Sequence, residues 1–107
     1  LNLVGSAIPT TAEVDVECVR RARFYVDSRT AAAAEAGELR AALAAGAVTA
    51  DHVLGEIGEV LAGRVPGRAN DTQITLYKSL GVASQDLAAG LHAFRNASAL
   101  GLGSDLH

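Results

Sequence analysis

Short apolar segments alternate along the chain with longer segments of helical periodicity. Residues 1–6 (LNLVGS) read as a short strand that ends in a Gly-Ser pair. Residues 22–28 (ARFYVDS) and 73–79 (QITLYKS) have the aromatic and β-branched composition of buried strands. The pattern therefore predicts three strands, each followed by helical sequence.

Four segments have the spacing of apolar residues that is typical of helices. They are residues 12–22 (AEVDVECVRRA), 29–48 (RTAAAAEAGELRAALAAGAV), 52–63 (HVLGEIGEVLAG) and 81–101 (GVASQDLAAGLHAFRNASALG). In the third segment, apolar side chains recur at i, i+4, i+7 and i+8 from Val53. Gly46 and Gly63 are expected to end the second and third segments. Glu13 is expected near the positive end of the first helix.

The order strand, helix, strand, helices, strand, helix is typical of an α/β layer whose strands run parallel. Three strands are too few for a doubly wound sheet, so the pattern predicts the second half of a Rossmann-type domain with flanking helices. The fingerprint GxGxxG, which places a dinucleotide pyrophosphate at a helix N-terminus, is absent. The glycines at Gly55, Gly58, Gly63 and Gly67 lie inside or after helical sequence instead, so the fold is expected to be incomplete.

Composition narrows the class of protein. The 107 residues are enough for one domain, and a hydrophobic share of 50% with 20% charged residues is a globular composition. The net charge of −3 and the scatter of the basic residues argue against a nucleic-acid or anionic-membrane surface. No apolar run approaches the length of a membrane span.

The cysteine content and the first residues indicate the cellular compartment of the chain and whether it is a fragment. The single Cys18 excludes an internal disulfide and suits a reducing compartment, so a cytoplasmic location is expected. The opening LNLVGSAIP lacks the basic region and the long apolar stretch of a signal peptide. Because the chain starts at Leu1 without a methionine and reads at once as the middle of a fold, we expect a fragment.

Four segments, in this order and at this spacing, resemble the ornithine cyclodeaminase/mu-crystallin family: VGSAIPTTAEVD, YVDSRTAAAAEAGEL, GEIGEVLAGRVPGR and ITLYKSLGVASQDLAAG. The resemblance covers almost the whole chain, from Leu1 to Gly103. It implies a longer parent with a substrate and dimerisation domain and an NAD(P)-binding Rossmann domain. Residues 1–81 would be the C-terminal half of the Rossmann domain. Residues 82–107 would be the helix and tail that return to the substrate domain.

The resemblance also implies a class of reaction. Members of the family cyclise ornithine with loss of ammonia, oxidise alanine or reduce cyclic ketimines, and some mainly bind a ligand. The parent is therefore expected to be an oxidoreductase that uses NAD or NADP on an amino or imino acid, and to form a homo-oligomer. The isolated chain is expected to be inactive.

Site residues follow from the same resemblance. Val4, Gly5 and Ser6 match the strand end beside the nicotinamide ring. Ser79 matches a residue at the same ring, where its hydroxyl would hydrogen-bond the carboxamide and fix the ring face. Glu35 matches the substrate pocket, where it would meet an ammonium group or a water. No catalytic residue is assigned in this chain, because the acid/base Lys, the carboxylate-binding Arg and the phosphate-binding loop match the missing part.

Local chemistry offers a second interpretation of each residue. The Gly-Ser pair after the first strand suits an ordinary turn, Ser79 suits the N-cap of the last helix, and Glu35 suits a solvated helix face. Asp27 is expected to cap the segment that follows it. Lys78 lies on the opposite face of its strand from Ser79 and is expected to be structural or a surface charge.

Ala7 is a departure from the cyclodeaminase pattern. In the cyclodeaminases proper, the segment after Val-Gly carries an aspartate that handles protons at the substrate amine, followed by Pro-Gly-Lys. Here the sequence is GSAIPTTAE, and Ala7 takes the place of the acid. Without that general base, hydride transfer is favoured over cyclising deamination.

The remaining polar residues predict no metal site. The three histidines, His52, His92 and His107, are too far apart in sequence to form a helical metal pair. Cys18 has no neighbouring ligand. No zinc or other metal is therefore expected.

A second hypothesis treats the chain as a non-catalytic ligand-binding or assembly module derived from the same fold. The last helix places Leu87, Leu91 and Phe94 on one stripe, which would be an association surface if it were exposed. This stripe predicts a dimer or a larger oligomer, or poor solubility.

Overall fold

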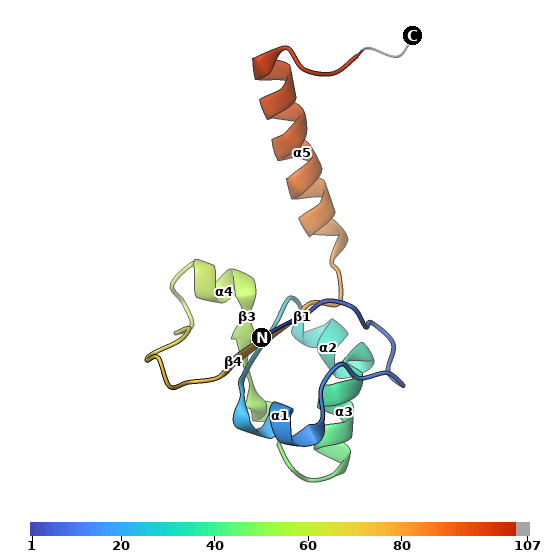
Figure 1. Cartoon of the computed structure of the whole chain (residues 1–107), viewed down its shortest axis with the longest axis vertical. Coiled ribbons are helices and arrows are strands. Elements are labelled where there is room, and N and C mark those ends of the chain that lie inside the picture. The colour runs from blue at the N-terminus through green and yellow to red at the C-terminus, as the bar shows by residue number, and fades with distance from the viewer. Residues whose placement is uncertain (105–107) are drawn as a thin grey trace.

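The structure is a computed structural model, and it describes residues 1–104. Its elements in chain order are β1 (Asn2–Leu3), α1 (Val16–Arg21), β2 (Arg23–Val26), α2 (Arg29–Glu35), α3 (Gly37–Ala44), the 3₁₀ turn η1 (Ala50–His52), β3 (Val53–Glu56), α4 (Ile57–Leu61), β4 (Thr75–Lys78) and α5 (Ala83–Leu100). Figure 1 shows these elements on the chain. The expected α/β class with a parallel sheet and flanking helices is confirmed.

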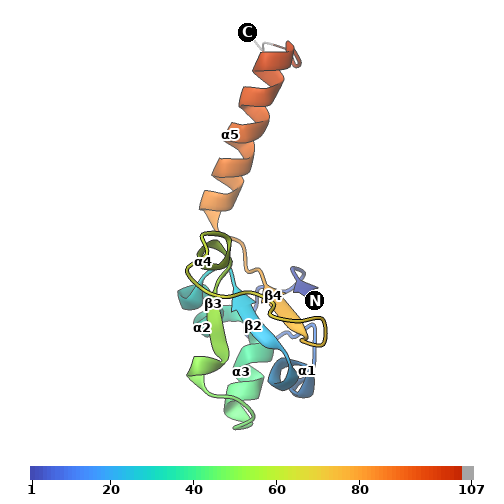
Figure 2. The same ribbon diagram turned by 90° about the vertical axis from the view of Figure 1, so that its left-hand side faces the viewer.

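The four strands form one parallel sheet in the order β1-β4-β2-β3. The last strand in the sequence, β4, lies between the first two, so Tyr77 is level with Asn2 on one side and with Tyr25 on the other. Because the strands are parallel, their carboxyl ends meet at a single edge of the sheet (Figure 2). In open α/β sheets this edge is where ligands bind.

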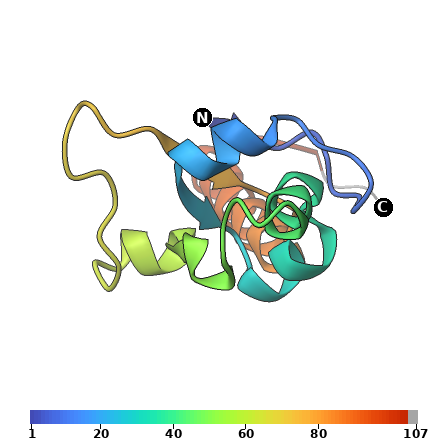
Figure 3. The ribbon, with the colours of Figure 1, turned by 90° about the horizontal axis from the view of Figure 1, so that it is seen from below.

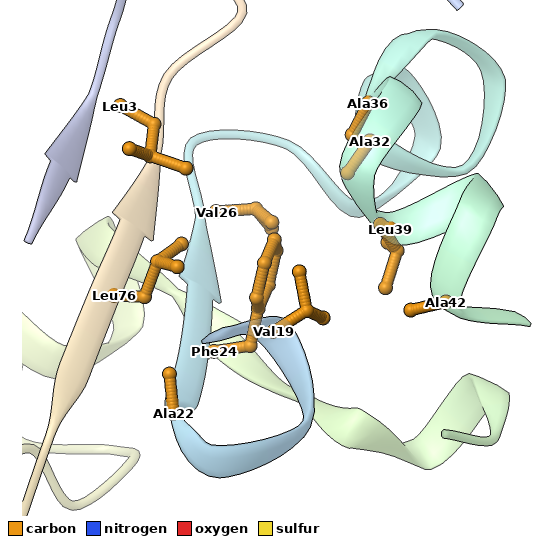
Figure 4. Close-up of a cluster of buried hydrophobic side chains, with 10 residues drawn as sticks. All are labelled: Leu3, Val19, Ala22, Phe24, Val26, Ala32, Ala36, Leu39, Ala42 and Leu76. Atoms are coloured by element: carbon orange, nitrogen blue, oxygen red, sulfur yellow. The ribbon is translucent and has the colours of Figure 1, made fainter. Parts of the chain in front are cut away.

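The core lies on the face of the sheet that α1, α2 and α3 cover (Figure 4). Phe24 and Val26 of β2 and Leu76 of β4 are completely buried there, against Val19 of α1 and Leu39 of α3. Alternate strand residues point to this face, as the two-residue period of a strand requires. The remaining buried members are Leu3, Ala22, Ala32, Ala36 and Ala42.

The opposite face of the sheet is covered mainly by the connection from α4 to β4, which extends past the sheet in Figure 3. The hydroxyl of Tyr25 donates to the carbonyl of Pro66 at 2.9 Å and fastens this connection to β2. Gly55 of β3 lies under Val65, and a Cβ at Gly55 would come within 2.8 Å of the valine side chain. Tyr77 on the same face is only half-buried.

Helix α5 stands away from the sheet (Figures 1 and 2) and makes the longest dimension of the chain 56 Å. The stripe expected on this helix is exposed, with Leu87 at 73% and Phe94 at 69% of full accessibility. Leu91 is also exposed. Within residues 1–104, no helix is long and apolar enough to cross a membrane.

Three expectations about local structure need correction. Residues 52–63 were expected to form one helix, but Val53–Glu56 is a strand and only Ile57–Leu61 is helical. The first helix begins at Val16 behind an Asp15 N-cap, so Glu13 lies before it rather than in its first turn. The Ala-rich segment forms two helices that break at Ala36.

A close backbone contact lies directly after the break at Ala36. A Cβ at Gly37 would lie 1.9 Å from the carbonyl oxygen of Thr11, so the loop after β1 packs directly against the backbone at the start of α3.

The predicted helix ends at Gly46 and Gly63 are confirmed, because Gly46 follows α3 and Gly63 follows α4, both with positive φ.

Candidate functional site

The carboxyl ends of β1 and β4 lie side by side, at the edge where open α/β sheets generally bind ligands. The backbone N–H of Ser79 donates to the carbonyl of Leu3 at 2.9 Å. This bond brings Ser79 next to Val4, which directly follows Leu3 and is 71% exposed. The fold thus brings Ser79 beside the turn formed by residues 4–6, although more than 70 residues separate them in sequence.

The turn from β4 to α5 is fixed by the carboxylate of Asp27. Its Oδ2 accepts hydrogen bonds from the backbone N–H of Leu80 at 2.7 Å, from the N–H of Gly81 at 2.8 Å and from the Ser79 hydroxyl at 3.1 Å. Gly81 has φ +88°, a conformation that glycine adopts without strain.

Two interpretations from local chemistry are wrong at this turn. Asp27 does not cap α2, because the N-cap of that helix is Ser28, whose hydroxyl accepts from the N–H of Ala31. Ser79 is not the N-cap of α5 either; Val82 occupies that position without a side-chain cap. The side chain of Asp27 instead contacts the residues that follow β4, the strand beside β2 in the sheet.

The turn after β1 is fixed by a second carboxylate. The N–H of Gly5 donates to Oε1 of Glu13 at 2.8 Å, and a Cβ at Gly5 would lie only 2.7 Å from that oxygen. The carboxylate of Glu13 thus lies directly against the backbone of this turn. The hydroxyls of Ser6 and Thr11 form a further contact across the same loop.

Lys78 connects this turn to the core. Its side chain is completely buried, so the surface-charge interpretation is wrong and the structural one is correct. Its Nζ donates to Oε2 of Glu13 at 2.8 Å and lies 3.2 Å from Oε1 of the buried Glu38. The hydrogen bond from Lys78 is the main reason that the pKa of Glu13 is lowered from its ordinary value.

Lys78 and Ser79 are consecutive residues that point to opposite faces, and each is bonded to a carboxylate from an earlier part of the chain. Glu13 and Asp27 thereby hold the two turns at which the candidate ligand-binding residues lie. Strand alternation predicted that Lys78 and Ser79 would face opposite ways. The partners Glu13, Glu38 and Asp27 gave no local signal in the sequence, because their contacts cross 40 to 65 residues.

Glu35 is not drawn into either network. It is the last residue of α2, and its side chain is exposed. Helix α2 begins directly after the carboxyl end of β2, and Glu35 lies at the far end of that helix.

The described residues hold no group of three side chains that is suited to a metal ion. The ring Nε2 of His52 contacts the carbonyl of Val19 at 2.7 Å, and the ring of His92 contacts the amide of Asn96. Cys18 packs half-buried against the core. His107 lies outside the described residues.

The edge formed by β1 and β4 combines an apolar surface with a directed polar group. It offers an exposed apolar residue, Val4, beside a half-buried hydroxyl, Ser79, and the backbone at both turns is held firmly by carboxylates. Small-molecule sites typically combine apolar surface with a few placed polar groups. A glycine-rich cradle for the pyrophosphate is not part of this edge.

Comparison with known proteins decides the family. The family model described as "Ornithine cyclodeaminase/mu-crystallin family" matches residues 1–99. The chain belongs to this family. The expected resemblance is therefore confirmed over almost the whole length of the chain.

Relatives within the ornithine cyclodeaminase/mu-crystallin family are oxidoreductases. The chain is 35% identical to an alanine dehydrogenase of Archaeoglobus fulgidus over 106 residues, which is 99% of this chain and 33% of the relative. It is 42% identical to the mouse (Mus musculus) ketimine reductase mu-crystallin over 89 residues, 83% of this chain and 26% of the relative.

A solved structure of the family extends the match to the fold. The Delta(1)-pyrroline-2-carboxylate reductase of Thermococcus litoralis, in complex with NADH and L-proline, matches with a TM-score of 0.87 at 32% identity. The match covers 98% of this chain and 32% of that chain. The chain thus spans about a third of the length of the relatives that it matches.

Proposed function

We propose that this chain is the C-terminal portion of an NAD(P)-dependent oxidoreductase that acts on an amino acid or a cyclic imino acid. The observation that carries the proposal is the meeting of Val4–Ser6 and Ser79 at adjacent carboxyl ends, made by the bond from the Ser79 N–H to the Leu3 carbonyl. A family whose members include an alanine dehydrogenase and a ketimine reductase supports the class of substrate.

The residues of this chain would form one wall of the nicotinamide site. Val4 would lie against the ring, Gly5 and Ser6 would shape the turn beside it, and Ser79 would bond the carboxamide. The bound cofactor would supply the hydride. These residues would present one ring face to the substrate, so that transfer occurs from a fixed side.

Glu35 is proposed to face the substrate rather than the cofactor. Its exposed carboxylate would attract the ammonium or iminium group of an amino- or imino-acid substrate. No group of this chain is assigned to proton transfer, and Ala7 provides none where the cyclodeaminases have an acid. Reduction of a C=N bond, or the reverse oxidation of an amine, is therefore favoured over cyclisation with loss of ammonia.

NAD(H) is the favoured cofactor, because solved relatives at 32–35% identity are complexes with NADH or NAD. A dimer is the favoured assembly, because the archaeal alanine dehydrogenase among them is a dimer. Residues 82–107 would reach the substrate domain through α5. Residues 1–81 would complete the Rossmann-type sheet at the free edge of β1.

The experiment is a comparison of the complete protein that contains this sequence with the chain 1–107 alone. Each is assayed for oxidation of NADH and NADPH with cyclic ketimines, and for reduction of NAD and NADP with alanine and proline. The complete protein is expected to turn over at least one of these substrates, and the isolated chain none. A complete protein that neither binds a nicotinamide cofactor nor reacts with any of them would refute the proposal.

A second candidate is an assembly module without chemistry, and the exposed stripe on α5 favours it. Leu87 and Phe94 stand open to solvent on a helix that leaves the sheet. Replacing Phe94 by Glu is expected to make an associating chain monomeric in sedimentation experiments. Ala89→Glu on the opposite side of the helix serves as the control. A wild-type chain that is monomeric at micromolar concentration argues against this candidate.

A further inference from the structure

Asp27 is nearly buried, at 9% exposure, and its carboxylate receives four hydrogen bonds. Oδ1 accepts from the N–H of Ser28 at 2.8 Å. Oδ2 accepts from three donors in the turn after β4, namely the N–H groups of Leu80 and Gly81 and the hydroxyl of Ser79. This side chain therefore links the carboxyl ends of two adjacent strands.

The direction of one of these bonds is dictated by chemistry. A carboxylate has no hydrogen to give, so it only accepts, whereas a serine hydroxyl has one hydrogen and two lone pairs. In the contact of 3.1 Å between Ser79 Oγ and Asp27 Oδ2, the hydrogen must therefore come from Ser79. With its hydrogen committed to Asp27, the hydroxyl has only lone pairs left for anything else.

The neighbouring donors of this turn are also occupied, so none of them is free to donate to a ligand beside Ser79. Lys78, the preceding residue, points to the opposite face and is bonded there to Glu13. The N–H groups of Leu80 and Gly81 are occupied by Asp27. The hydroxyl of Ser79 consequently presents an acceptor, with a fixed orientation, to the space beyond the edge of the sheet.

We propose that Asp27 is a positioning residue that makes Ser79 an acceptor for the amide nitrogen of the nicotinamide carboxamide. The inference rests on the proposed function, because it takes Ser79 to lie at the nicotinamide. It adds the direction of the bond: the carboxamide NH₂ donates to Ser79 Oγ, and the carboxamide oxygen points elsewhere. This direction selects one of the two ways in which the amide group can turn, and it favours substituents that carry an N–H.

The test uses the complete protein and two reduced cofactors, the natural dihydronicotinamide dinucleotide and its 3-acetylpyridine analogue. The analogue keeps the carbonyl oxygen but replaces the NH₂ by a methyl group, so it cannot donate. Dissociation constants for both are measured by titration calorimetry in the absence of substrate. Wild-type protein is expected to bind the natural cofactor more tightly by about 3- to 10-fold, as one hydrogen bond of typical net strength gives.

Variants of Ser79 test the direction of the bond. Ser79→Ala is expected to lower the preference for the natural cofactor about 3-fold or more, chiefly by weakening its binding. Ser79→Thr, which keeps the hydroxyl, is expected to retain the preference. If Ser79→Ala weakens both cofactors equally, or leaves their ratio unchanged, the acceptor role is refuted.

Variants of Asp27 test the positioning role. Asp27→Ala removes the oxygen on which three donors converge, so the Ser79 hydroxyl loses its fixed acceptor and the preference is expected to fall. Should this variant fail to fold, Asp27→Glu keeps the charge and shifts the carboxylate by one methylene, with the same expected loss. A preference that stays at the wild-type value in a folded Asp27 variant overturns the role of Asp27. If wild-type protein binds neither cofactor, the proposed function fails as well; normal binding with a ratio independent of Ser79 refutes this inference alone.

Discussion

Replacing Lys78 by Met is expected to destabilise the fold strongly through loss of charge rather than loss of volume. The side chains of Lys78 and Glu38 are both completely shielded from solvent, and Nζ lies 3.2 Å from the glutamate Oε1. Within residues 1–104, neither carboxylate oxygen of Glu38 has a hydrogen-bond partner. Among the described residues, the ammonium group of Lys78 is therefore the charge that lies close enough to compensate this buried carboxylate. Methionine has a similar length but leaves Glu38 uncompensated.

The magnitude follows from the distance and the burial. At an effective dielectric constant of about 20, opposite unit charges 3.2 Å apart attract each other by about 5 kcal/mol. Removing one partner of a buried pair typically costs about 3–5 kcal/mol, because the other charge stays buried. That is a large fraction of the stability of a domain, which is about 5–15 kcal/mol. Glu13 is less affected, since its side chain is 25% exposed and water can solvate it.

The assay is urea unfolding followed by circular dichroism. With a slope of about 1–3 kcal/mol per M, the Lys78→Met midpoint is expected to fall by about 2 M. The double variant Lys78→Met/Glu38→Leu is expected to recover most of this loss, because an apolar replacement of both partners removes the buried charge. The control is Arg20→Met, which breaks the exposed pair with Glu17 and should hardly move the midpoint. Equal destabilisation of the single and double Lys78 variants would refute the electrostatic reasoning.

Three further predictions concern the contacts that hold loops against the helices and the sheet. Gly37→Ala is expected to destabilise by about 2 kcal/mol or more, because its Cβ would meet the carbonyl of Thr11; an unchanged midpoint in urea would contradict this. The pKa of Glu13 is lowered in the fold, so its stabilising effect is present above the ordinary carboxyl pKa and is lost as the pH falls through the lowered value. Glu13→Gln should therefore flatten the acid side of the stability curve, measured from about pH 6 to pH 3, and a curve parallel to wild type would be evidence against the interaction. Tyr25→Phe removes the donor to the Pro66 carbonyl and should cost about 1 kcal/mol by the same unfolding assay, with a neutral result counting against this bond.

Much of the fold could be predicted from local patterns. Strand composition identified β2 and β4, and the glycines after α3 and α4 were placed correctly because a positive φ has a clear sequence signal. Strand β3 was missed, because Val53–Glu56 passes directly into α4 and the combined apolar spacing is that of a helix. The strand exists because it pairs with β2, and a pairing between distant segments is not visible in a local pattern.

In the candidate site, too, some residues could be predicted from the sequence and others only from the fold. The resemblance to the family suggested Val4–Ser6 and Ser79 as candidates, and the fold brings them to one edge. Alternation placed Lys78 opposite Ser79, but nothing local showed whether that face was covered. Asp27 looked like a helix cap because aspartate at the end of a strand often is one. Its partners come 52 to 54 residues later, and only the placement of β4 beside β2 makes the contacts possible.

The most direct test of the account is a crystal structure of the complete protein with NADH bound. We expect the nicotinamide ring to lie against Val4, with its carboxamide nitrogen within about 2.7–3.2 Å of Ser79 Oγ while that hydroxyl keeps its contact with Asp27. A nicotinamide bound away from the carboxyl ends of β1 and β4 would contradict the proposed site. A carboxamide oxygen facing the Ser79 hydroxyl would leave the site in place and contradict the direction of the bond.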